Sequence, residues 1–208
     1  MKILIIDDHA MIRAGLKQFF AGISPSGATV METDNGKSAL ALQKSERPNL
    51  TVLDLNMPGL SGLELLRLLL QVDASARVLV FSMHGEPVYA AKAMEIGARG
   101  YLSKNASPEE LRTALSRILA GSTYVEGEIA QQLAALPGEQ RQQLSERDLE
   151  ILRLLGEGRS FTEIAHQLGL GYKTVANTAT SIKSKLGVAR TADLIRLSVE
   201  MGIGRQVP

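Results

Sequence analysis

Five short apolar runs, each followed by a stretch whose apolar residues recur at helical spacing, constrain the fold of this 208-residue chain more than any other feature. The run at residues 50–55 is nearly continuous rather than alternating, which is typical of a strand that helices bury on both faces of a parallel sheet. The five runs occupy residues 2–7, 29–33, 50–55, 78–82 and 100–103. Five strands that alternate with five helices predict a doubly wound α/β domain around a parallel sheet.

The helices of this domain are expected at residues 10–20, 38–44, 63–70, 86–96 and 108–120. Two of them have clear start patterns. Ser61 with Glu64 forms a capping box before the third helix, and Ser107 with Glu110 does the same before the last one. Pro108 adds a residue that is favoured at the first helical position.

Polar residues stand where the expected strands end. Right-handed crossovers place the carboxyl ends of parallel strands on one edge of the sheet, where open α/β domains bind their ligands. The residues at these ends are Asp7, Asp8, Asp54, Ser82 and Lys104. The sequence therefore predicts a group of carboxylates with a hydroxyl and a lysine at this edge, although Asp54 alone could also be an acid that only accepts a hydrogen bond in a turn.

The chemistry of this group favours phosphoryl transfer. Neighbouring carboxylates repel one another unless a cation lies among them, and oxygen ligands suit the hard ion Mg²⁺. Asp54 would be the nucleophile, while Lys104 and the metal neutralise charge on the phosphoryl oxygens and Ser82 donates a hydrogen bond to one of them. The chain has no Gly-rich phosphate loop, so a bound nucleotide is not expected.

Composition limits the compartment and the kinds of site. The chain has no Cys, which excludes disulfides and thiolate metal sites. Its apolar amino-terminal run is too short for a signal peptide, and no segment approaches the length of a membrane span. We expect a cytoplasmic protein without a membrane partner.

The pattern loosens at residues 123–143, which we interpret as a linker with a short helix at 128–135. Helical patterns resume at residue 144. Ser145 with Asp148 and Ser160 with Glu163 are two N-terminal capping patterns, and the turn at 170–172 joins two short helices. This arrangement is a helix-turn-helix in a small all-α domain.

The second helix of that motif, residues 173–186, has an apolar face and a polar face. Hydroxyls, amides and lysines are what a helix needs to enter the major groove of DNA, although an ordinary amphipathic surface helix has the same periodicity. Residues 164–192 contain no Asp or Glu, which favours an anionic partner. The candidate DNA-binding residues are Lys173, Thr174, Asn177, Thr178, Ser181, Lys183 and Lys185.

Residues 1–122 resemble the receiver domain of bacterial two-component response regulators. The resemblance rests on Asp7-Asp8, Asp54 followed by Met57-Pro58-Gly59, Ser82, and Tyr101 three residues before Lys104. It implies the strand order 2-1-3-4-5 and a phosphoryl group that Asp54 takes from a sensor histidine kinase. It also implies Mg²⁺ held by Asp8, Asp54 and the backbone carbonyl of Asn56, with Asp7 acting through water.

Two further roles follow from the same resemblance. Ser82 and Tyr101 would act as a coupled switch, and Tyr101 could equally be a core aromatic residue. His84, two residues after Ser82, would tune the lifetime of the aspartyl phosphate, or be an exposed loop histidine.

Residues 144–208 resemble the four-helix DNA-binding domain of the NarL/FixJ, or LuxR-type, regulators. The similarity runs from Leu144-Ser145-Glu146-Arg147-Asp148 through the turn and second helix to the Leu186-Gly187-Val188 segment. It implies that a fourth helix, residues 191–201, forms the dimer contact on DNA. The apolar residues of that helix, Leu194, Ile195 and Leu197, could instead close the core of the domain itself.

Together these features predict a phosphorylation-gated transcription regulator with a receiver at 1–122, a linker at 123–143 and a DNA-binding domain at 144–208. In the resting chain, the receiver and linker would cover or misplace residues 173–186. The expected partners are a sensor histidine kinase, double-stranded promoter DNA, a second copy of the chain when phosphorylated or DNA-bound, and, as a further candidate, RNA polymerase.

Two alternatives remain. A haloacid-dehalogenase-like phosphatase would need Asp-x-Asp-x-Thr, which the segment that starts at Asp54 lacks, so we expect no enzyme with a separate substrate beyond slow loss of the chain's own phosphoryl group. The other alternative is a regulator whose receiver is a phosphate-independent docking module.

Overall fold

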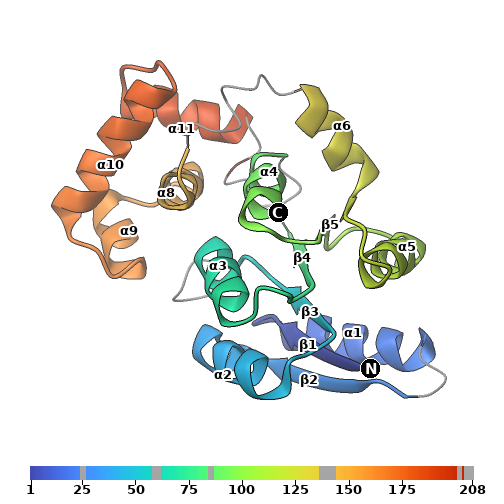
Figure 1. Cartoon of the computed structure of the whole chain (residues 1–208). Helices are drawn as coiled ribbons and strands as arrows, with labels where there is room; N and C mark the ends of the chain where they lie inside the picture. Colours follow the sequence, from blue (N-terminus) through green and yellow to red (C-terminus); the bar gives the residue numbers. More distant parts are fainter. Residues whose placement is uncertain (24–26, 58–61, 84–86, 136–143, 201–202, 204–208) are drawn as a thin grey trace.

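A computed structural model describes residues 1–23, 27–57, 62–83, 87–135, 144–200 and 203. Its central feature is a parallel sheet of six strands in the order β2-β1-β3-β4-β5-β6 (Figure 1). The strands are β1 (Lys2–Ile6), β2 (Thr29–Thr33), β3 (Leu50–Leu53), β4 (Val78–Ser82), β5 (Gly100–Ser103) and β6 (Tyr124–Val125). The predicted fold class and the order of the first five strands are confirmed.

Helices cover both faces of this sheet because the side chains of each strand alternate between the faces. The five helices of this domain are α1 (Ala10–Ile23), α2 (Gly36–Glu46), α3 (Gly62–Val72), α4 (Pro87–Ile96) and α5 (Pro108–Leu119). Leu4 and Ile6 of β1 belong to the buried cluster that contains residues of α2, α3 and α4, whereas Ile3 and Ile5 belong to the cluster that contains residues of α1 and α5. Ser107 caps α5 by accepting the Glu110 N–H at 3.1 Å, but the Glu110 carboxylate accepts the Tyr124 hydroxyl, so only half of the predicted capping box is present. Ser61 lies outside the described residues.

The sixth strand lies in the segment that the sequence predicts as linker. Tyr124 and Val125 pair with Gly100 and Tyr101 of β5 and extend the sheet by one edge strand. A strand of two residues is too short to show a period in the sequence. The predicted helix at 128–135 is present as α6 (Gly127–Ala135), which packs against α4 and buries Ile129.

The second domain consists of α8 (Glu146–Gly156), α9 (Phe161–Gln167), α10 (Tyr172–Lys185) and α11 (Thr191–Glu200). Both predicted capping boxes are present, at Ser145 with Asp148 and at Ser160 with Glu163. α11 packs against α8, and Leu194 is fully buried there, so this residue closes the domain's own core. Ile195 and Leu197 are half-buried.

The two domains meet where α8 lies beside α3 and α4 of the receiver (Figure 1). The buried hydroxyl of Tyr89 on α4 donates a hydrogen bond of 3.1 Å to the carbonyl oxygen of Leu149 on α8. Arg67 of α3 forms an ion pair with Glu146 of α8. Among the described residues, every helix is too short or too polar to cross a membrane.

Candidate functional site

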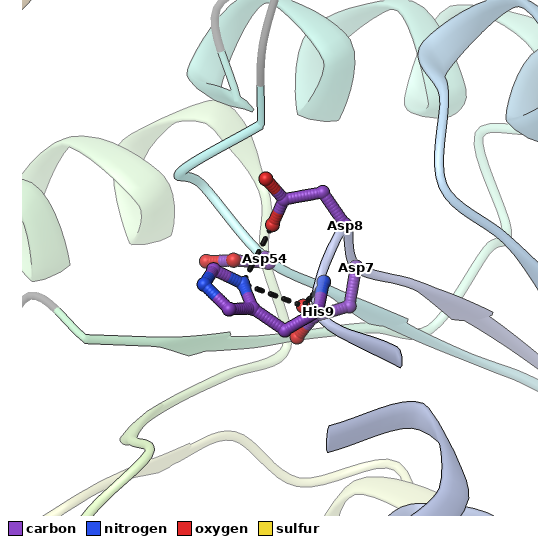
Figure 2. Close-up of side chains that lie close together, drawn as sticks. All are labelled: Asp7, Asp8, His9 and Asp54. Atoms are coloured by element: carbon purple, nitrogen blue, oxygen red, sulfur yellow. Dashed lines mark hydrogen bonds and ion pairs between the residues drawn. The ribbon is translucent and has the colours of Figure 1, made fainter. Parts of the chain in front are cut away.

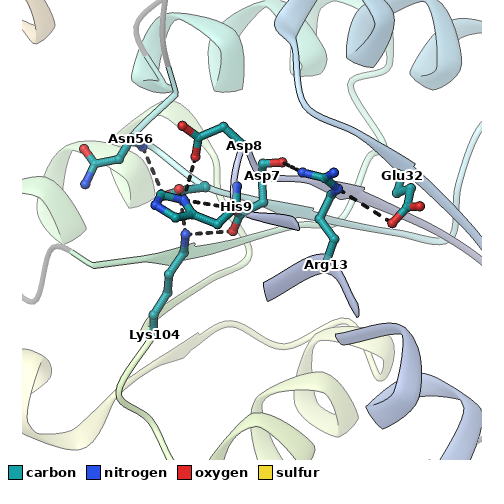
Figure 3. Close-up of polar contacts among 8 residues, drawn as sticks. Asp7, Asp8, His9, Arg13, Glu32, Asn56 and Lys104 are labelled. Carbon is teal, nitrogen blue, oxygen red and sulfur yellow. Dashed lines mark hydrogen bonds and ion pairs between the residues drawn. The ribbon is translucent and has the colours of Figure 1, made fainter. Parts of the chain in front are cut away.

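Three strand ends bring together a lysine and two carboxylates. β1, β3 and β5 are followed directly by Asp7, Asp54 and Lys104, and the parallel register places these residues on one edge of the sheet. The Nζ atom of Lys104 lies 2.7 Å from Asp7 Oδ2 (Figure 3). It also lies 2.7 Å from Asp54 Oδ2. All three side chains are at most 3 % exposed, so the ammonium compensates two carboxylates that water does not reach freely.

Asp54 is held in a fixed orientation. The backbone N–H of Asn56 donates a hydrogen bond of 3.0 Å to Asp54 Oδ1, which leaves Oδ2 for Lys104. Burial raises the pKa of Asp54 above its ordinary value, while Lys104 and the Asn56 N–H act in the opposite direction. The carboxylate is therefore costly to keep charged here, and a second cation at this edge would favour the charged form.

A cluster of metal-ligand atoms surrounds this carboxylate. Asp7, Asp8, His9 and Asp54 each place one candidate ligand atom within 4.8 Å of the others (Figure 2). The Oδ1 atom of Asp8 is buried and accepts no hydrogen bond from the described residues, although His9 Nδ1 lies 2.6 Å from it. Three carboxylates, one of them with a buried oxygen, form a predominantly oxygen donor set that fits a hard divalent cation such as Mg²⁺.

His9 and Arg13 belong to this site, although they were missed at the sequence level. His9 follows the acidic pair; its backbone N–H donates a hydrogen bond of 2.8 Å to Asp7 Oδ1, and its ring Nδ1 lies 3.3 Å from the same oxygen. Arg13 donates a hydrogen bond of 2.7 Å to the carbonyl oxygen of Asp7. Arg13 also lies 3.7 Å from Glu32 of β2 (Figure 3). The adjacency of His9 to two acids was the only indication in the sequence, because the Arg13 contacts depend on how α1 packs.

The candidate switch residues are both buried. Ser82 is fully buried at the end of β4 and pairs in register with Ser103 of β5. Tyr101 is also fully buried and lies in the apolar cluster that contains α4 residues and Ile129 of α6. The Tyr101 side chain therefore already points into the core in this structure. His84, Pro58 and Gly59 lie outside the described residues.

The candidate DNA-binding helix presents its polar face to solvent. Most of the predicted contact residues are exposed, and Thr178 and Lys183 are half-buried. The exposed residues are Lys173, Thr174, Asn177, Ser181 and Lys185. The sequence predicts that the receiver and linker cover or misplace this helix; its exposed polar face excludes covering in this conformation, and misplacement stays a prediction. The apolar face of α10 instead packs on α8 and α9.

Lys185 has a structural partner that the sequence did not indicate. Its ammonium forms an ion pair with Asp148, whose carboxylate also accepts a hydrogen bond of 2.8 Å from the backbone N–H of Ser145 in the capping box of α8. This lysine consequently joins α10 to the start of α8. A ligand of α10 would compete with Asp148 for its ammonium group.

Comparisons with known families agree with both halves of the chain. Residues 3–116 match the response regulator receiver domain, and residues 142–198 match the family described as bacterial regulatory proteins, luxR family. A transcriptional activator from Pseudomonas putida, ExaE, is 42 % identical over 99 % of both chains. The response regulator UvrY of Escherichia coli K12 is 32 % identical over 98 % of this chain and 95 % of its own length.

Solved structures show the same two-domain architecture. RcsB of Salmonella enterica serovar Typhimurium, bound to promoter rprA with the phosphomimetic BeF3-, superposes with a TM-score of 0.73 at 26 % identity. The alignment covers 94 % of this chain and 97 % of RcsB. Sequence and structure thus agree that the chain is a member of the NarL/FixJ family of two-component response regulators, which join a receiver domain to a LuxR-type helix-turn-helix domain.

Proposed function

We propose that this response regulator accepts a phosphoryl group at Asp54 and thereby gains affinity for promoter DNA. The observation that carries the proposal is the buried Asp54 carboxylate, fixed by the Asn56 N–H and placed 2.7 Å from the Lys104 ammonium. The proposed donor is the phosphohistidine of a sensor kinase, and the proposed target is double-stranded DNA, which RcsB binds in its structure.

The chemistry needs a nucleophile and neutralised charge. One carboxylate oxygen of Asp54 attacks the phosphorus, the phosphorus–nitrogen bond of the donor breaks, and the new bond is an acyl phosphate. Lys104 would then pair with a phosphoryl oxygen, and the Ser82 hydroxyl, at the end of the neighbouring strand β4, would donate a hydrogen bond to another. Asp8, Asp54 and the Asn56 carbonyl would hold Mg²⁺, with Asp7 acting through water, and the bound ion would supply positive charge to compensate the phosphoryl oxygens.

The phosphoacceptor turn lies directly beside the DNA-binding domain. A small cavity is lined by Asn56 and Met57 of the turn on one side and by Glu150 and Arg153 of α8 on the other. The charge that phosphorylation adds at Asp54 therefore arises next to the helix that docks the second domain, and burial already raises the pKa of Glu150 above its ordinary value. Phosphorylation of Asp54 would therefore change the charge balance at this contact, where it repels Glu150 and attracts Arg153.

Gating would act through the position of α10 rather than through its burial. The polar face of α10 is exposed, but α8 holds the whole domain against α3 and α4. Two such domains must align as a pair on a DNA site with two halves, and docking on the receiver restricts that alignment. Release of α8 would permit a homodimer to form on DNA. The shift from the docked to the released state needs only a few kcal/mol of differential interaction.

Phosphotransfer itself can be tested on the full chain with acetyl phosphate as donor. We expect the intact mass to increase by one phosphoryl group only when Mg²⁺ is present, and peptide mapping to place that group on Asp54. A phosphoryl group on another residue, or none under any condition, would contradict the assignment of the site.

Magnesium should stabilise the wild-type protein against heat, because it binds the folded acid cluster and not the unfolded chain. At about one hundred times the dissociation constant, the expected gain in unfolding free energy is about 2.7 kcal/mol. Asp8→Asn should lose most of this gain, whereas the exposed Asp34→Asn control should keep it. Thermal unfolding scans with and without Mg²⁺ measure the effect, and an undiminished gain in Asp8→Asn would remove Asp8 from the metal site.

Tyr89→Phe should loosen the domain contact and raise DNA affinity without any phosphoryl group. The substitution removes one buried hydrogen bond, from Tyr89 to Leu149, which is worth about 1 kcal/mol, or about fivefold in the docking equilibrium. Tyr124→Phe is a matched control, since it removes a 3.0 Å hydrogen bond to Glu110 inside the receiver. Equal DNA affinities for the two variants, measured by fluorescence anisotropy, would contradict a restraining role for the contact.

A further inference from the structure

Glu126 holds the strand end that carries Lys104. β6 ends at Val125, and the next residue, Glu126, donates its backbone N–H to the carbonyl oxygen of Tyr101 at 3.0 Å. The side chain of Glu126 then takes the place of the next strand carbonyl. Its Oε2 atom accepts the backbone N–H of Ser103 at 2.6 Å, and its Oε1 atom lies 3.3 Å from the Ser103 hydroxyl. Because the acceptor is a charged carboxylate, this hydrogen bond is stronger than an ordinary backbone hydrogen bond between strands.

The hydrogen bonds from Ser103 to the Glu126 carboxylate lie one residue before Lys104. On the other side of β5, the backbone N–H of Lys104 donates to the carbonyl oxygen of Ser82 at 2.8 Å. The backbone of residues 103 and 104 is thus held from both neighbouring strands while the ammonium of Lys104 reaches Asp54. An ammonium that must pass from a carboxylate oxygen to a phosphoryl oxygen depends on such a fixed backbone.

Glu126 also stands at the start of the helix that packs on α4. α6 begins at Gly127, and its buried Ile129 lies in the same cluster as Tyr89 and Tyr101. Tyr89 in turn makes the hydrogen bond to the second domain. The Glu126 side chain therefore connects the Ser103 amide to the start of α6, in addition to the direct packing of β5 on α4.

We propose that Glu126 is a positioning residue for Lys104 in the phosphoryl chemistry of Asp54, and that its carboxylate links the phosphoacceptor edge to α6. The inference rests on the proposed phosphoacceptor function. The segment that follows α5 would then take part in the reaction as well as connect the two domains.

The test uses the full chain, Mg²⁺ and acetyl phosphate, with the rate of phosphoryl gain followed by intact mass. Glu126→Ala should slow the reaction about tenfold, as the loss of a supporting partner commonly does. Glu126→Gln keeps an oxygen for the Ser103 amide and should fall between Glu126→Ala and wild type. Glu128→Ala removes the same charge two residues further along, from an exposed position, and should react like wild type.

Hydrogen exchange distinguishes a positioning role of Glu126 from a merely structural one, because a structural role would not alter the response of α6 amides to beryllofluoride. Beryllofluoride with Mg²⁺ should change the exchange of amides near Asp54 and in α6 of the wild type. In Glu126→Ala the change near Asp54 should persist and the change in α6 should disappear. If Glu126→Ala does not fold, Glu126→Gln against Glu128→Gln provides the same comparison of rate and exchange.

A rate and an α6 response in the Glu126 variants equal to those of the Glu128 controls would overturn the proposal. Failure of the wild type itself to gain a phosphoryl group would overturn the phosphoacceptor function, and this proposal with it. We expect Glu126→Ala to gain the phosphoryl group slowly and to show no change in the hydrogen exchange of α6. Glu128→Ala should match the wild type in both measurements.

Discussion

Asp54→Asn is expected to abolish the response of DNA binding to phosphorylation. Asparagine has no nucleophilic carboxylate, so neither acetyl phosphate nor beryllofluoride can act at this position. The uncharged side chain also cannot form the 2.7 Å ion pair with Lys104, but Asp7 keeps that ammonium compensated. We therefore expect a folded protein whose DNA dissociation constant is the same with and without the phosphodonor.

Asp34→Asn is the matched control, because Asp34 is an exposed acid outside the cluster. It should gain one phosphoryl group and respond on DNA like wild type. Retention of the response by Asp54→Asn would show that another residue accepts the phosphoryl group.

Gly62→Ala should destabilise the receiver strongly. Gly62 is the first residue of α3, and a Cβ atom there would collide with the backbone of Leu55, including the carbonyl carbon at 2.7 Å. Backbone atoms cannot move aside as a flexible side chain can. We expect a loss of about 3 kcal/mol in unfolding free energy, or a fall in Tm of roughly 10 °C.

Gly15→Ala is the counterpart of this substitution. Gly15 is exposed in the middle of α1, and a Cβ atom there would meet nothing among the described residues within 4 Å. It should stabilise the helix by about 0.5–1 kcal/mol. Thermal unfolding of the two variants in parallel measures both effects, and equal melting temperatures would contradict the close approach of α3 to the Asp54 turn.

Much of the receiver could be predicted from the sequence because its parts are local or follow from topology. Apolar runs of four or five residues specify the strands, and capping patterns specify helix starts such as that at Ser107. Parallel strands then place their carboxyl ends on one edge, so Asp7, Asp54 and Lys104 could be expected to meet before any distance was known.

The remaining features depend on tertiary contacts that leave no period in the sequence. β6 is two residues long, and Glu126 acquires its role only because the sheet edge brings it to Ser103, 23 residues earlier. The contact between Tyr89 and Leu149 joins residues 60 positions apart. Docking of α8 on the receiver is a property of two complementary surfaces, which neither domain's pattern shows alone.

The most direct test of a phosphorylation-gated regulator is a titration of the full chain with promoter-derived DNA at one stated salt concentration, with and without Mg²⁺ and beryllofluoride. Fixed salt matters because phosphate contacts make the affinity strongly dependent on it. We predict binding that is sequence-selective and at least about tenfold tighter with the mimic, the factor that about 1.4 kcal/mol of differential interaction gives. Equal dissociation constants in the two conditions would contradict gating and leave the receiver as a phosphate-independent docking module.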